Sequence, residues 1–523
     1  MNTRQLFILA SILICSALLL FKLYWLLIVA GPVIILGLYD LLQTRHTILR
    51  IYPVIGHMRY FFEAIRPEIQ QYFVESNISG RPLNREFRDL VYQRAKNQRD
   101  TRPFGTQFDV YRSGYEWINH SLAPVENDDK HPRIEFGGPE CQKPYFASPL
   151  NISAMSYGAL SKHAIMALNK GASLGKFSHN TGEGGLSPYH LKHGGDIVWQ
   201  IGTGYFGCRN SEGGFDKDLF AEKAQLDVVK MIEIKLSQGA KPGHGGILPA
   251  AKLTREIAQI RHVPMGHDVV SPPSHSAFDT PTGLLEFIRE LRNLCGGKPV
   301  GFKLCIGNKS EFLGICKAMI ATGITPDFIT VDGAEGGTGA APIEFTNSVG
   351  TPLRDAVIFV NDALIGTGLR ENIRVIASAK ILSAFHMARI LALGADTVNS
   401  ARGMMLALGC IQSRSCNTDK CPTGIATQDP ARYTSLNIED KGKRVANFHS
   451  ATVAALVDLI GACGINKLEE LDLHHIHRRV SGTETASYRD LYPTMAPHCL
   501  VIEESRPGSW ELIWNDSSAA KWY

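Results

Sequence analysis

The stretch "PVGFKLCIGNKSEFLGICKAMIATGITPDFITVDGAEGGTG" at residues 299–339 decides the fold. An apolar run of strand length ends in a loop, and a stretch with helical spacing of apolar residues follows it. A second apolar run then ends in a glycine-rich loop. This order of strand, helix and strand is typical of a βαβ unit with parallel strands. A larger parallel sheet would require the same rhythm to recur elsewhere in the chain.

Counting the two strands of this stretch, the pattern of strand followed by loop and helix occurs eight times along the chain. Predicted strands begin the segments "LNISAMSYG" (150), "FSHNTGEGG" (177), "IVWQIGTG" (197), "IEIKLSQGAKPG" (232), "PVGFKLCIG" (299), "DFITVDGAEGGTG" (327), "IRVIASA" (373) and "ADTVNSARG" (395). Predicted helices between them include residues 161–175, 283–294, 310–323 and 383–394. Eight such units fit an α/β fold of the (β/α)8 TIM barrel type better than a doubly wound sheet. The active site of such a barrel forms in the loops after the strands.

The first forty residues contain two uncharged apolar runs. They are "LFILASILICSALLLF" (6–21) and "LYWLLIVAGPVIILGLY" (23–39), separated by Lys22. One helix through both would be about 50 Å long, whereas a bilayer core is about 30 Å thick. We expect a transmembrane anchor, either a hairpin of two helices or one span with extra length. A cleaved signal peptide fits less well because the apolar stretch is too long and lacks a cleavage site; a buried core helix is the remaining alternative.

Basic residues follow the apolar runs. Residues 41–112 hold twelve Lys and Arg against seven Asp and Glu. No nucleic-acid-binding motif accompanies them, so we expect no nucleic acid partner. The excess is what the positive-inside rule predicts for a protein of the inner, cytoplasmic membrane whose catalytic domain faces the cytoplasm. Thiols are kept reduced in that compartment, which argues against disulfides.

The chain of 523 residues is too long for one ordinary domain. We divide it into an anchor at 1–45, with one or two helices, and a basic, irregular and partly helical segment at 46–145. The barrel follows at 146–480 and an extension at 481–523. Hydrophobic content of 44% and charged content of 20% are ordinary for a folded protein.

Three cysteines lie close together in "CIQSRSCNTDKCPTGIATQ" (410–428). Cys410, Cys416 and Cys421 have the spacing C-x5-C-x4-C, and a proline follows the last. A structural zinc site needs four ligands, and only the distant His449 could supply the fourth. Thiolates are the usual ligands of iron–sulfur clusters, and three of them match a 3Fe-4S cluster. Three buried free thiols are the alternative, because cysteine is common in protein cores.

Two further features lie at predicted strand ends. Gly336, Gly337, Thr338 and Gly339 follow the sixth strand, where a backbone of this kind can approach a phosphate, although most glycine-rich turns are only turns. Small residues also end the seventh strand (378–380) and the eighth (400–403), as in phosphate-binding barrels. Lys303 lies in an apolar strand, where it either reaches the barrel rim or faces an electron-rich ring such as a flavin.

Positive side chains gather after the fourth strand. Lys235, Lys241 and Arg261, with Gln238, would suit a dicarboxylate if they converge at the barrel mouth. Surface Lys and Arg are, however, usually solvated. The chain has no Ser/His/Asp triad, zincin or Walker motif.

Several motifs together resemble a known family. "NISAMSYGALSKHA", "SHNTGEGG", "IKLSQGAKPGHGG", "GGTGAAP" and "LGCIQSRSCNTDKCPTGIATQDP" are similar, in this order, to the FMN- and 3Fe-4S-binding synthase domain of glutamate synthase. The resemblance covers about residues 146–450. In detail the chain resembles the stand-alone, membrane-anchored proteins related to this domain.

The resemblance implies cofactors and roles. It implies an FMN site at Ala154, Met155, Ser156, Lys303, Gly337, Thr338, Gly339, Ala379, Ala401 and Arg402. It implies a 2-oxoglutarate site at Lys235, Gln238, Lys241, Arg261 and Glu183, and cluster ligands at Cys410, Cys416 and Cys421. The implied reaction passes electrons through the cluster and FMN to a 2-oxo or 2-imino acid and forms glutamate.

Departures from the family pattern leave alternatives open. We expect no glutaminase domain, so ammonia would come from a partner or from solution. Tyr205 replaces an arginine of the family pattern, although Arg209 is near in sequence; Ile247 replaces a glutamine and Ala379 a glycine. A second reading is therefore a membrane-anchored FMN/3Fe-4S oxidoreductase with a different substrate, and a third is an electron relay without turnover. The electron partner would be ferredoxin, a quinone or a reductase subunit.

Overall fold

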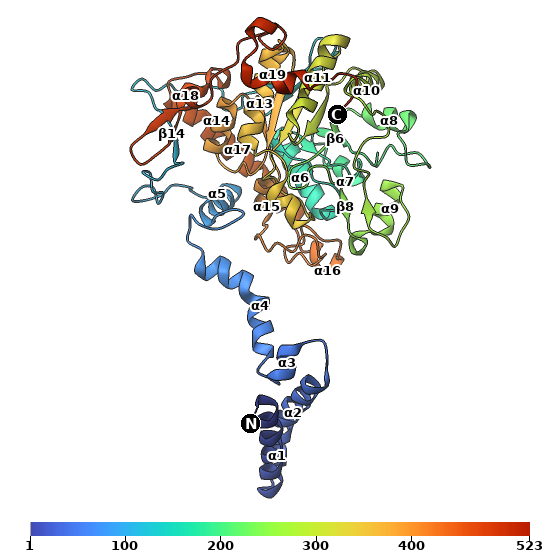
Figure 1. Cartoon of the computed structure of the whole chain (residues 1–523), viewed down its shortest axis with the longest axis vertical. Coiled ribbons are helices and arrows are strands. Elements are labelled where there is room, and N and C mark those ends of the chain that lie inside the picture. Colours follow the sequence, from blue (N-terminus) through green and yellow to red (C-terminus); the bar gives the residue numbers. More distant parts are fainter. Residues whose placement is uncertain (1, 523) are drawn as a thin grey trace. The chain divides into compact units, whose positions relative to one another are not determined.

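The computed structural model describes residues 2–522. The chain divides into two compact units, Met1–Pro82 and Leu83–Tyr523. This boundary falls inside the basic segment predicted at 46–145. Figure 1 shows the helical first unit in dark and medium blue and the barrel of the second unit in the remaining colours.

The first unit begins with a helical hairpin. Helix α1 (Thr3–Leu20) and helix α2 (Leu27–Leu42) are separated by a turn in which Lys22 has a left-handed φ of +55°. The two helices pack closely, because a Cβ atom on Gly37 would lie 2.0 Å from the ring of Phe7. Of the two geometries considered for the apolar runs, the structure has the hairpin. Two further helices complete the unit, α3 (Thr47–Ile51) and α4 (His57–Ile69), which continues into a π-helical turn (Gln70–Val74).

Eight parallel strands of the second unit form a closed barrel. They run in the order β4 (Leu150–Ile152), β5 (His179–Asn180), β6 (Ile197–Ile201), β7 (Val229–Lys235), β10 (Val300–Leu304), β11 (Phe328–Asp332), β12 (Arg374–Ser378) and β13 (Thr397–Ser400), and β13 pairs with β4. Seven of them fall within the predicted segments, and β7 begins three residues before the segment predicted from residue 232. The predicted (β/α)8 TIM barrel is confirmed.

Helices cover the outside of the barrel (Figure 1). They are α6 (Lys162–Gly175), α7 (Pro188–Leu191), α8 (Lys217–Ala224), α9 (Arg255–Arg261), α10 (Pro281–Leu294), α11 (Lys309–Thr322), α12 (Ile343–Ser348), α13 (Leu353–Gly366), α14 (Ala384–Ala392), α15 (Arg402–Leu408), α16 (Pro430–Tyr433) and α17 (Ile438–Ala462). Local capping explains where they begin: Ser161 and Ser383 accept the backbone N–H of the third helical residue in α6 and α14. The four helices predicted between strands are α6, α10, α11 and α14.

The remaining elements surround this core. They are α5 (Arg85–Ala95), β1 (Glu116–Ile118), β2 (Ile134–Phe136), β3 (Tyr145–Ala147), β8 (Ile247–Leu248), β9 (Val269–Val270), β14 (Ile476–Arg479), β15 (Thr485–Ser487), α18 (Tyr488–Leu491) and α19 (Gly508–Asn515). Strands β1, β14 and β15 form an antiparallel sheet. The β2–β3 hairpin closes the amino-terminal end of the barrel, where the rings of Phe136 and Phe328 lie 5.8 Å apart. The opposite, carboxyl end of the strands is therefore the end available for a site.

A polar group fills the centre of the barrel. The buried carboxylate of Glu233 accepts hydrogen bonds from Asn180 Nδ2 (2.8 Å), Gln200 Nε2 (2.6 Å) and Thr330 Oγ1 (2.6 Å). Three neutral donors compensate for the loss of water around this carboxylate.

Within residues 2–522, three helices are long and apolar enough, by length and composition, to cross a membrane: Thr3–Leu20, Tyr24–Leu42 and Ile438–Ala462. The third of these spans is α17, which packs against α6 in the barrel unit and buries Val445, Phe448 and Leu456 there. Its apolar face is thus accounted for by the core of the second unit.

Candidate active site

A pocket opens at the carboxyl end of the barrel strands. Its lining residues come from β4, β7 and β10–β13 or from the loops that follow them: Ser153, Ala154, Gln238, Lys303, Asp332, Gly336, Gly337, Ser378, Ala379, Lys380, Asn399, Ala401 and Arg402. Six of the ten residues expected at the cofactor are among them, together with Gln238 of the expected substrate group. Thr338 and Gly339 lie next to the lining and are exposed.

Lys303 faces this pocket instead of the barrel rim. Its side chain is 6% exposed, and Nζ lies 3.9 Å from Oδ2 of Asp332. The same carboxylate oxygen accepts the backbone N–H of Gly239 at 2.9 Å. Asp332 is a lining residue that sequence reasoning missed, although its position directly after a predicted strand was a usable signal.

One side of the pocket gathers donors for an anion. The backbone at Gly337 lies so close to Arg402 that a Cβ atom there would be 2.5 Å from Nε and Nη2 of the guanidinium. Arg402 Nη2 donates to the carbonyl of Glu335 at 3.2 Å, and burial lowers the pKa of Arg402. The hydroxyls of Ser153 and Ser378, 3.1 Å apart, lie across the same pocket. A guanidinium, two hydroxyls and the lysine at position 380 are suitable donors for a phosphate.

The charged residues expected at a substrate gather around Glu183. Lys235 Nζ donates to Glu183 Oε1 at 2.7 Å. Burial raises the pKa of Glu183, but Lys235, Arg261 and Lys241 outweigh it and hold the pKa below its usual value. Burial and the neighbouring Lys235 lower the pKa of Lys241 to about 8, against an opposing effect of Glu183. The four side chains form one interacting group, which we call the Glu183 group.

Arg261 enters this group from the end of α9. Its side chain is 4% exposed, and Nη2 donates to the carbonyl of Tyr157 at 3.1 Å. A Cβ atom on Gly158 or Gly184 would lie 3.0 or 2.9 Å from Nη2, so glycine at both positions makes room for the guanidinium. Among the described residues, Nε of Arg261 is buried without a hydrogen-bond partner. A ligand carboxylate would satisfy that donor.

The Glu183 group and the pocket are adjacent. Lys235 and Lys303 are register partners on the neighbouring strands β7 and β10. Burial and, to a smaller extent, the charge of Lys303 lower the pKa of Lys235, against the opposing effect of Glu183. Met155 and Ser156 lie against the loop that carries Glu183. A Cβ atom on Gly182, the residue before Glu183, would be 2.8 Å from the backbone nitrogen of Ser156. A cofactor in the pocket and an anion at the Glu183 group would therefore be neighbours.

The cysteine-rich segment follows α15 and contains free thiols. All eleven cysteines of the chain are unpaired in the part that the structure describes. Burial and then the charges of Cys416 and Cys421 raise the pKa of Cys410 to about 11, so the three thiols lie near one another. Burial raises the pKa of Cys421, but the hydroxyl of Thr423 and the backbone N–H groups of residues 423, 425 and 426 bring it below its usual value.

The zinc alternative with His449 does not fit this arrangement. Nε2 of His449 lies 2.8 Å from the Ser148 hydroxyl, and its ring stacks on Phe177 with centroids 3.9 Å apart. The imidazole is thus engaged by residues away from the cysteine segment. His449 therefore does not supply a fourth ligand for zinc.

Hydrogen bonds tie the cysteine segment to the loop after β4, the loop that carries Ala154–Ser156. Gln428 Nε2 donates to the carbonyls of Gly158 (3.0 Å) and Leu160 (2.9 Å). Buried Lys252 Nζ donates to the carbonyls of Ala159 (2.7 Å) and Cys416 (3.2 Å). We call these contacts the loop clamp; they connect the thiols mechanically to the pocket.

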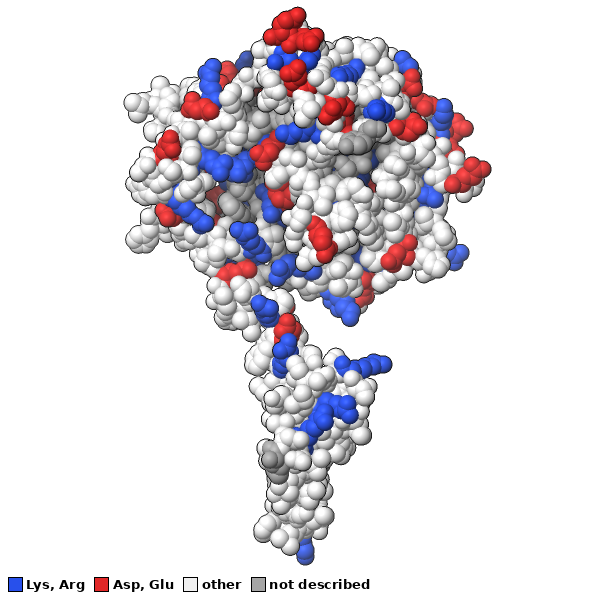
Figure 2. Space-filling view, in the orientation of Figure 1, with Lys and Arg blue, Asp and Glu red and all other residues white. Residues whose placement is uncertain are grey.

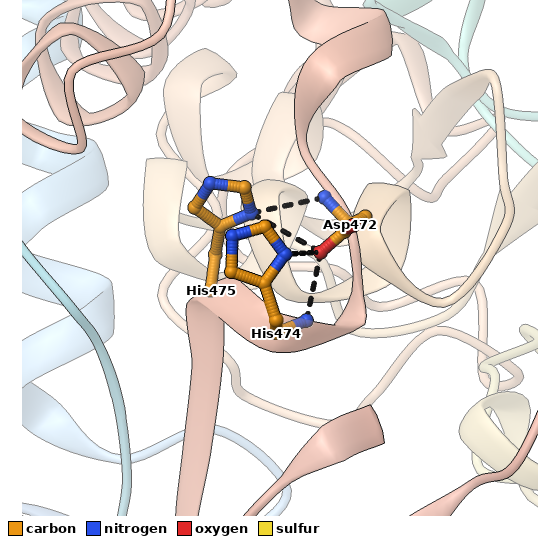
Figure 3. Close-up of side chains that lie close together, drawn as sticks. All are labelled: Asp472, His474 and His475. Atoms are coloured by element: carbon orange, nitrogen blue, oxygen red, sulfur yellow. Dashed lines mark hydrogen bonds and ion pairs between the residues drawn. The ribbon is translucent and has the colours of Figure 1, made fainter.

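A second group of metal-ligating residue types lies outside the barrel mouth. Asp472, His474 and His475 bring three ligand atoms within 4.8 Å of one another (Figure 3). Nδ1 of His475, however, accepts the backbone N–H of Asp472 at 3.2 Å, and the Asp472 carboxylate accepts the N–H of His474 at 2.8 Å. These bonds cap the short 3₁₀ helix Leu473–His475 and use the lone pair that a metal would need. The group is a helix cap.

Tyr205, which stands in place of an arginine of the family pattern, and the nearby Arg209 are both held by contacts of their own. Tyr205 is fully buried, and its hydroxyl accepts the N–H groups of Ser276 and Ala277 and lies 3.1 Å from His275 Nδ1. Arg209 donates to the carbonyl of Gly204 at 3.2 Å. Neither residue replaces the missing cation at the Glu183 group by a contact of its own.

A family model described as a conserved region in glutamate synthase matches residues 108–466. The chain belongs to the glutamate synthase family. It is 38% identical over 501 residues to the glutamate synthase large subunit-like protein YerD of Bacillus subtilis (strain 168), covering 87% of this chain and 95% of that protein. Membership makes it an oxidoreductase of the glutamate synthase type.

Other glutamate synthase family relatives match a part of their length. The archaeal glutamate synthase [NADPH] of Methanocaldococcus jannaschii is 37% identical over 325 residues, which are 62% of this chain and 60% of that enzyme. Among solved structures, a double mutant of flavocytochrome b2 with sulfite bound aligns with a TM-score of 0.43 and 11% identity over 81% of this chain and 86% of that one.

Proposed function

We propose that this glutamate synthase family member reduces a 2-imino acid formed from 2-oxoglutarate and ammonia to glutamate, using FMN and a 3Fe-4S cluster. The net charge of the Glu183 group carries the proposal. Lys235, Lys241 and Arg261 supply three positive charges and Glu183 one negative charge, so two positive charges remain uncompensated. A dicarboxylate of charge −2 would neutralise them, and buried charges require such neutralisation.

The pocket residues fit FMN. Arg402, the lysine at position 380 and the serine hydroxyls would hold the phosphate, because the close approach of Gly337 to Arg402 leaves a cradle at that end. Lys303 would face the electron-rich part of the ring system. When bound, the cluster would supply electrons one at a time and the flavin a hydride to the imino carbon.

The cysteine segment fits a cluster better than a single ion. Among the described residues, the Sγ atoms of Cys410, Cys416 and Cys421 do not all lie within 4.8 Å of one another. Thiolates that each bind a different iron atom stand farther apart than ligands of one ion. The backbone N–H groups and the Thr423 hydroxyl around Cys421 are the hydrogen bonds that cluster thiolates accept.

The protein side chains would position the substrate. Lys235 and Arg261 would each bind one carboxylate of the substrate. The unpartnered Nε of Arg261 would donate a hydrogen bond to that carboxylate and so fix its orientation. Gln238 lines the pocket on the loop that follows Lys235 and would orient the imino or oxo group. Most of these side chains are buried, so water is excluded and their electrostatic effect on the substrate is strengthened.

A direct assay tests the proposal. Purified full-length protein with dithionite or reduced ferredoxin, 2-oxoglutarate and ammonium is expected to form glutamate. Absence of glutamate from protein that carries both cofactors would contradict it. A different substrate, with a quinone or ferredoxin as electron partner, is the second candidate, and the neutral, hydrogen-bonded Tyr205 in place of an arginine favours it.

We also propose that the α1–α2 hairpin anchors the protein in the inner membrane with the barrel in the cytoplasm. The surface of the hairpin in Figure 2 is almost free of charged side chains. Leu20, Ile28 and Leu42 are 77%, 78% and 80% exposed, a degree of apolar exposure that suits lipid. Arg45, Arg50, Arg59 and Arg66 follow the hairpin, as expected on a cytoplasmic side. Carbonate-resistant membrane association of full-length protein, lost when residues 1–45 are removed, would support this.

The pKa of Lys241 predicts a pH dependence. Because burial and Lys235 lower that pKa to about 8, Lys241 loses its charge as the pH rises through 8. A dianionic substrate binds the protonated form, so KM for 2-oxoglutarate should rise about tenfold between pH 8 and pH 9.5 while changing little below pH 7. Steady-state kinetics from pH 6.5 to 9.5 measure this. Lys241→Arg should remove the rise; a rise that persists in this variant would assign it to another group.

The pocket geometry predicts the effect of a single methyl group. Gly337→Ala should displace the Arg402 guanidinium and weaken FMN binding about tenfold. Gly339→Ala is the matched control, because a Cβ atom at Gly339 meets nothing within 4 Å. Flavin fluorescence on titration of deflavinated protein measures both. Equal affinities in the two variants would contradict the assignment of the phosphate end.

A further inference from the structure

Arg88 is a buried arginine without the partners that such a residue needs. It lies on α5, is 1% exposed, and its Nε and Nη2 atoms have no hydrogen-bond partner among the described residues. Burying an unpaired guanidinium is costly, so buried arginines are found with anions or carbonyls. An anionic group that binds at this place would remove the cost.

The cysteine segment is the neighbour that could hold such an anion. Tyr92 of the same helix donates from its hydroxyl to the carbonyl of Cys410 at 2.6 Å. Gln412 Nε2 donates to the carbonyl of Leu83, just before α5, at 3.1 Å. Arg88 and Tyr92 are four residues apart and thus share one face of α5. The charge of Arg88 also acts to lower the pKa of Cys410, which burial raises.

A second buried arginine on the same helix, Arg94, has hydrogen-bond partners for its donors. Arg94 donates from Nε to the Asp100 carboxylate at 2.8 Å and from Nη1 to the Thr452 hydroxyl at 3.2 Å. Its side chain is 9% exposed. The helix therefore buries one guanidinium whose donors are bonded and one with two unbonded nitrogens, and the second shares a helix face with Tyr92, which contacts Cys410.

We propose that Arg88 donates hydrogen bonds from Nε and Nη2 to the iron–sulfur cluster and raises its reduction potential. This inference rests on the proposed function, because it requires the cluster. A cluster held by three thiolates is anionic and becomes more so on reduction, so a fixed positive charge and N–H donors stabilise the reduced form. Arg88 lies before residues 108–466, the part of the chain that the family model matches. The role proposed here therefore belongs to a residue outside the conserved region of the family.

The test compares Arg88→Met with Arg94→Met in the full-length protein. Redox titration followed by electron paramagnetic resonance should give a more negative cluster potential in Arg88→Met, by at least a tenfold change in the ratio of reduced to oxidised cluster, or about 59 mV for one electron. Arg94→Met should leave the potential unchanged. Electron–nuclear double resonance after exchange into D₂O should show loss of an exchangeable proton coupling in Arg88→Met alone.

Each outcome decides between the possibilities. A wild-type potential in Arg88→Met with an intact cluster overturns the inference, and so does an equal shift in both variants. If Arg88→Met fails to fold, Arg88→Lys keeps the charge without the planar fork and should retain part of the potential but lose the proton coupling. A wild-type coupling in Arg88→Lys also overturns it. Wild-type protein that never shows a cluster signal contradicts the proposed function instead.

Discussion

Cys416→Ser is expected to abolish the 3Fe-4S signal and, with it, electron delivery to the pocket. With three thiolates and three irons, the loss of one leaves an iron without its protein ligand, and a serine hydroxyl does not replace a soft thiolate. Oxidised wild-type protein should show a 3Fe-4S electron paramagnetic resonance signal. The variant should be yellow instead of yellow-brown, with little of that signal and activity reduced to background.

Cys463→Ser is the control for this change. Cys463 is also partly exposed and unpaired, but its thiol only donates to the carbonyl of Leu459 at 3.2 Å at the end of α17. We expect a normal cluster signal in that variant. A full signal in Cys416→Ser would remove Cys416 from the ligand set and would reopen the reading of the segment as three buried thiols.

Lys235→Met is expected to reduce kcat/KM for 2-oxoglutarate about 100-fold, because truncating one partner of a buried charge contact costs about 3 kcal/mol. The methionine also leaves Glu183 without its 2.7 Å partner. Removing one member of a buried ion pair destabilises a protein by about 3 kcal/mol or more. Steady-state kinetics and denaturant unfolding measure the two effects, and the net charge of the Glu183 group falls from +2 to +1.

Lys298→Met separates loss of charge at the site from loss of a buried lysine. Lys298 is 7% exposed and donates to the carbonyls of Ala224 and Leu226 at 2.7 and 2.8 Å, before the start of β10. The Lys298→Met variant should lose stability as Lys235→Met does, yet the protein that remains folded should keep the full kcat/KM. If Lys235→Met retained wild-type kcat/KM, the dicarboxylate site would have to lie elsewhere.

The barrel could be predicted because its signals are local. Each strand is a short apolar run that ends in a polar or glycine-rich loop, and each helix has its own spacing of apolar residues. The pocket could be predicted in part for the same reason: residues such as Ala154, Lys303 and Ala401 are at the carboxyl ends of strands that must meet.

What could not be predicted depends on contacts distant in sequence. The sequence shows Lys235, Lys241 and Arg261 as three cations, but only the fold shows that they surround Glu183 and leave a net charge of +2. Arg88 is one of the twelve basic residues that the sequence assigns to the positive-inside signal beside the anchor. Its burial follows from the packing of α5 on α15 and α17, for which a single sequence carries no local signal.

The loop clamp has a consequence for how the protein matures in a cell. Lys252 and Gln428 attach the segment that would receive iron and sulfide to the segment that would receive the flavin ring. Folding of the first therefore fixes the shape of the second. Cells starved of iron should accumulate a form of the protein that is poor in flavin as well as in iron, even when riboflavin is abundant.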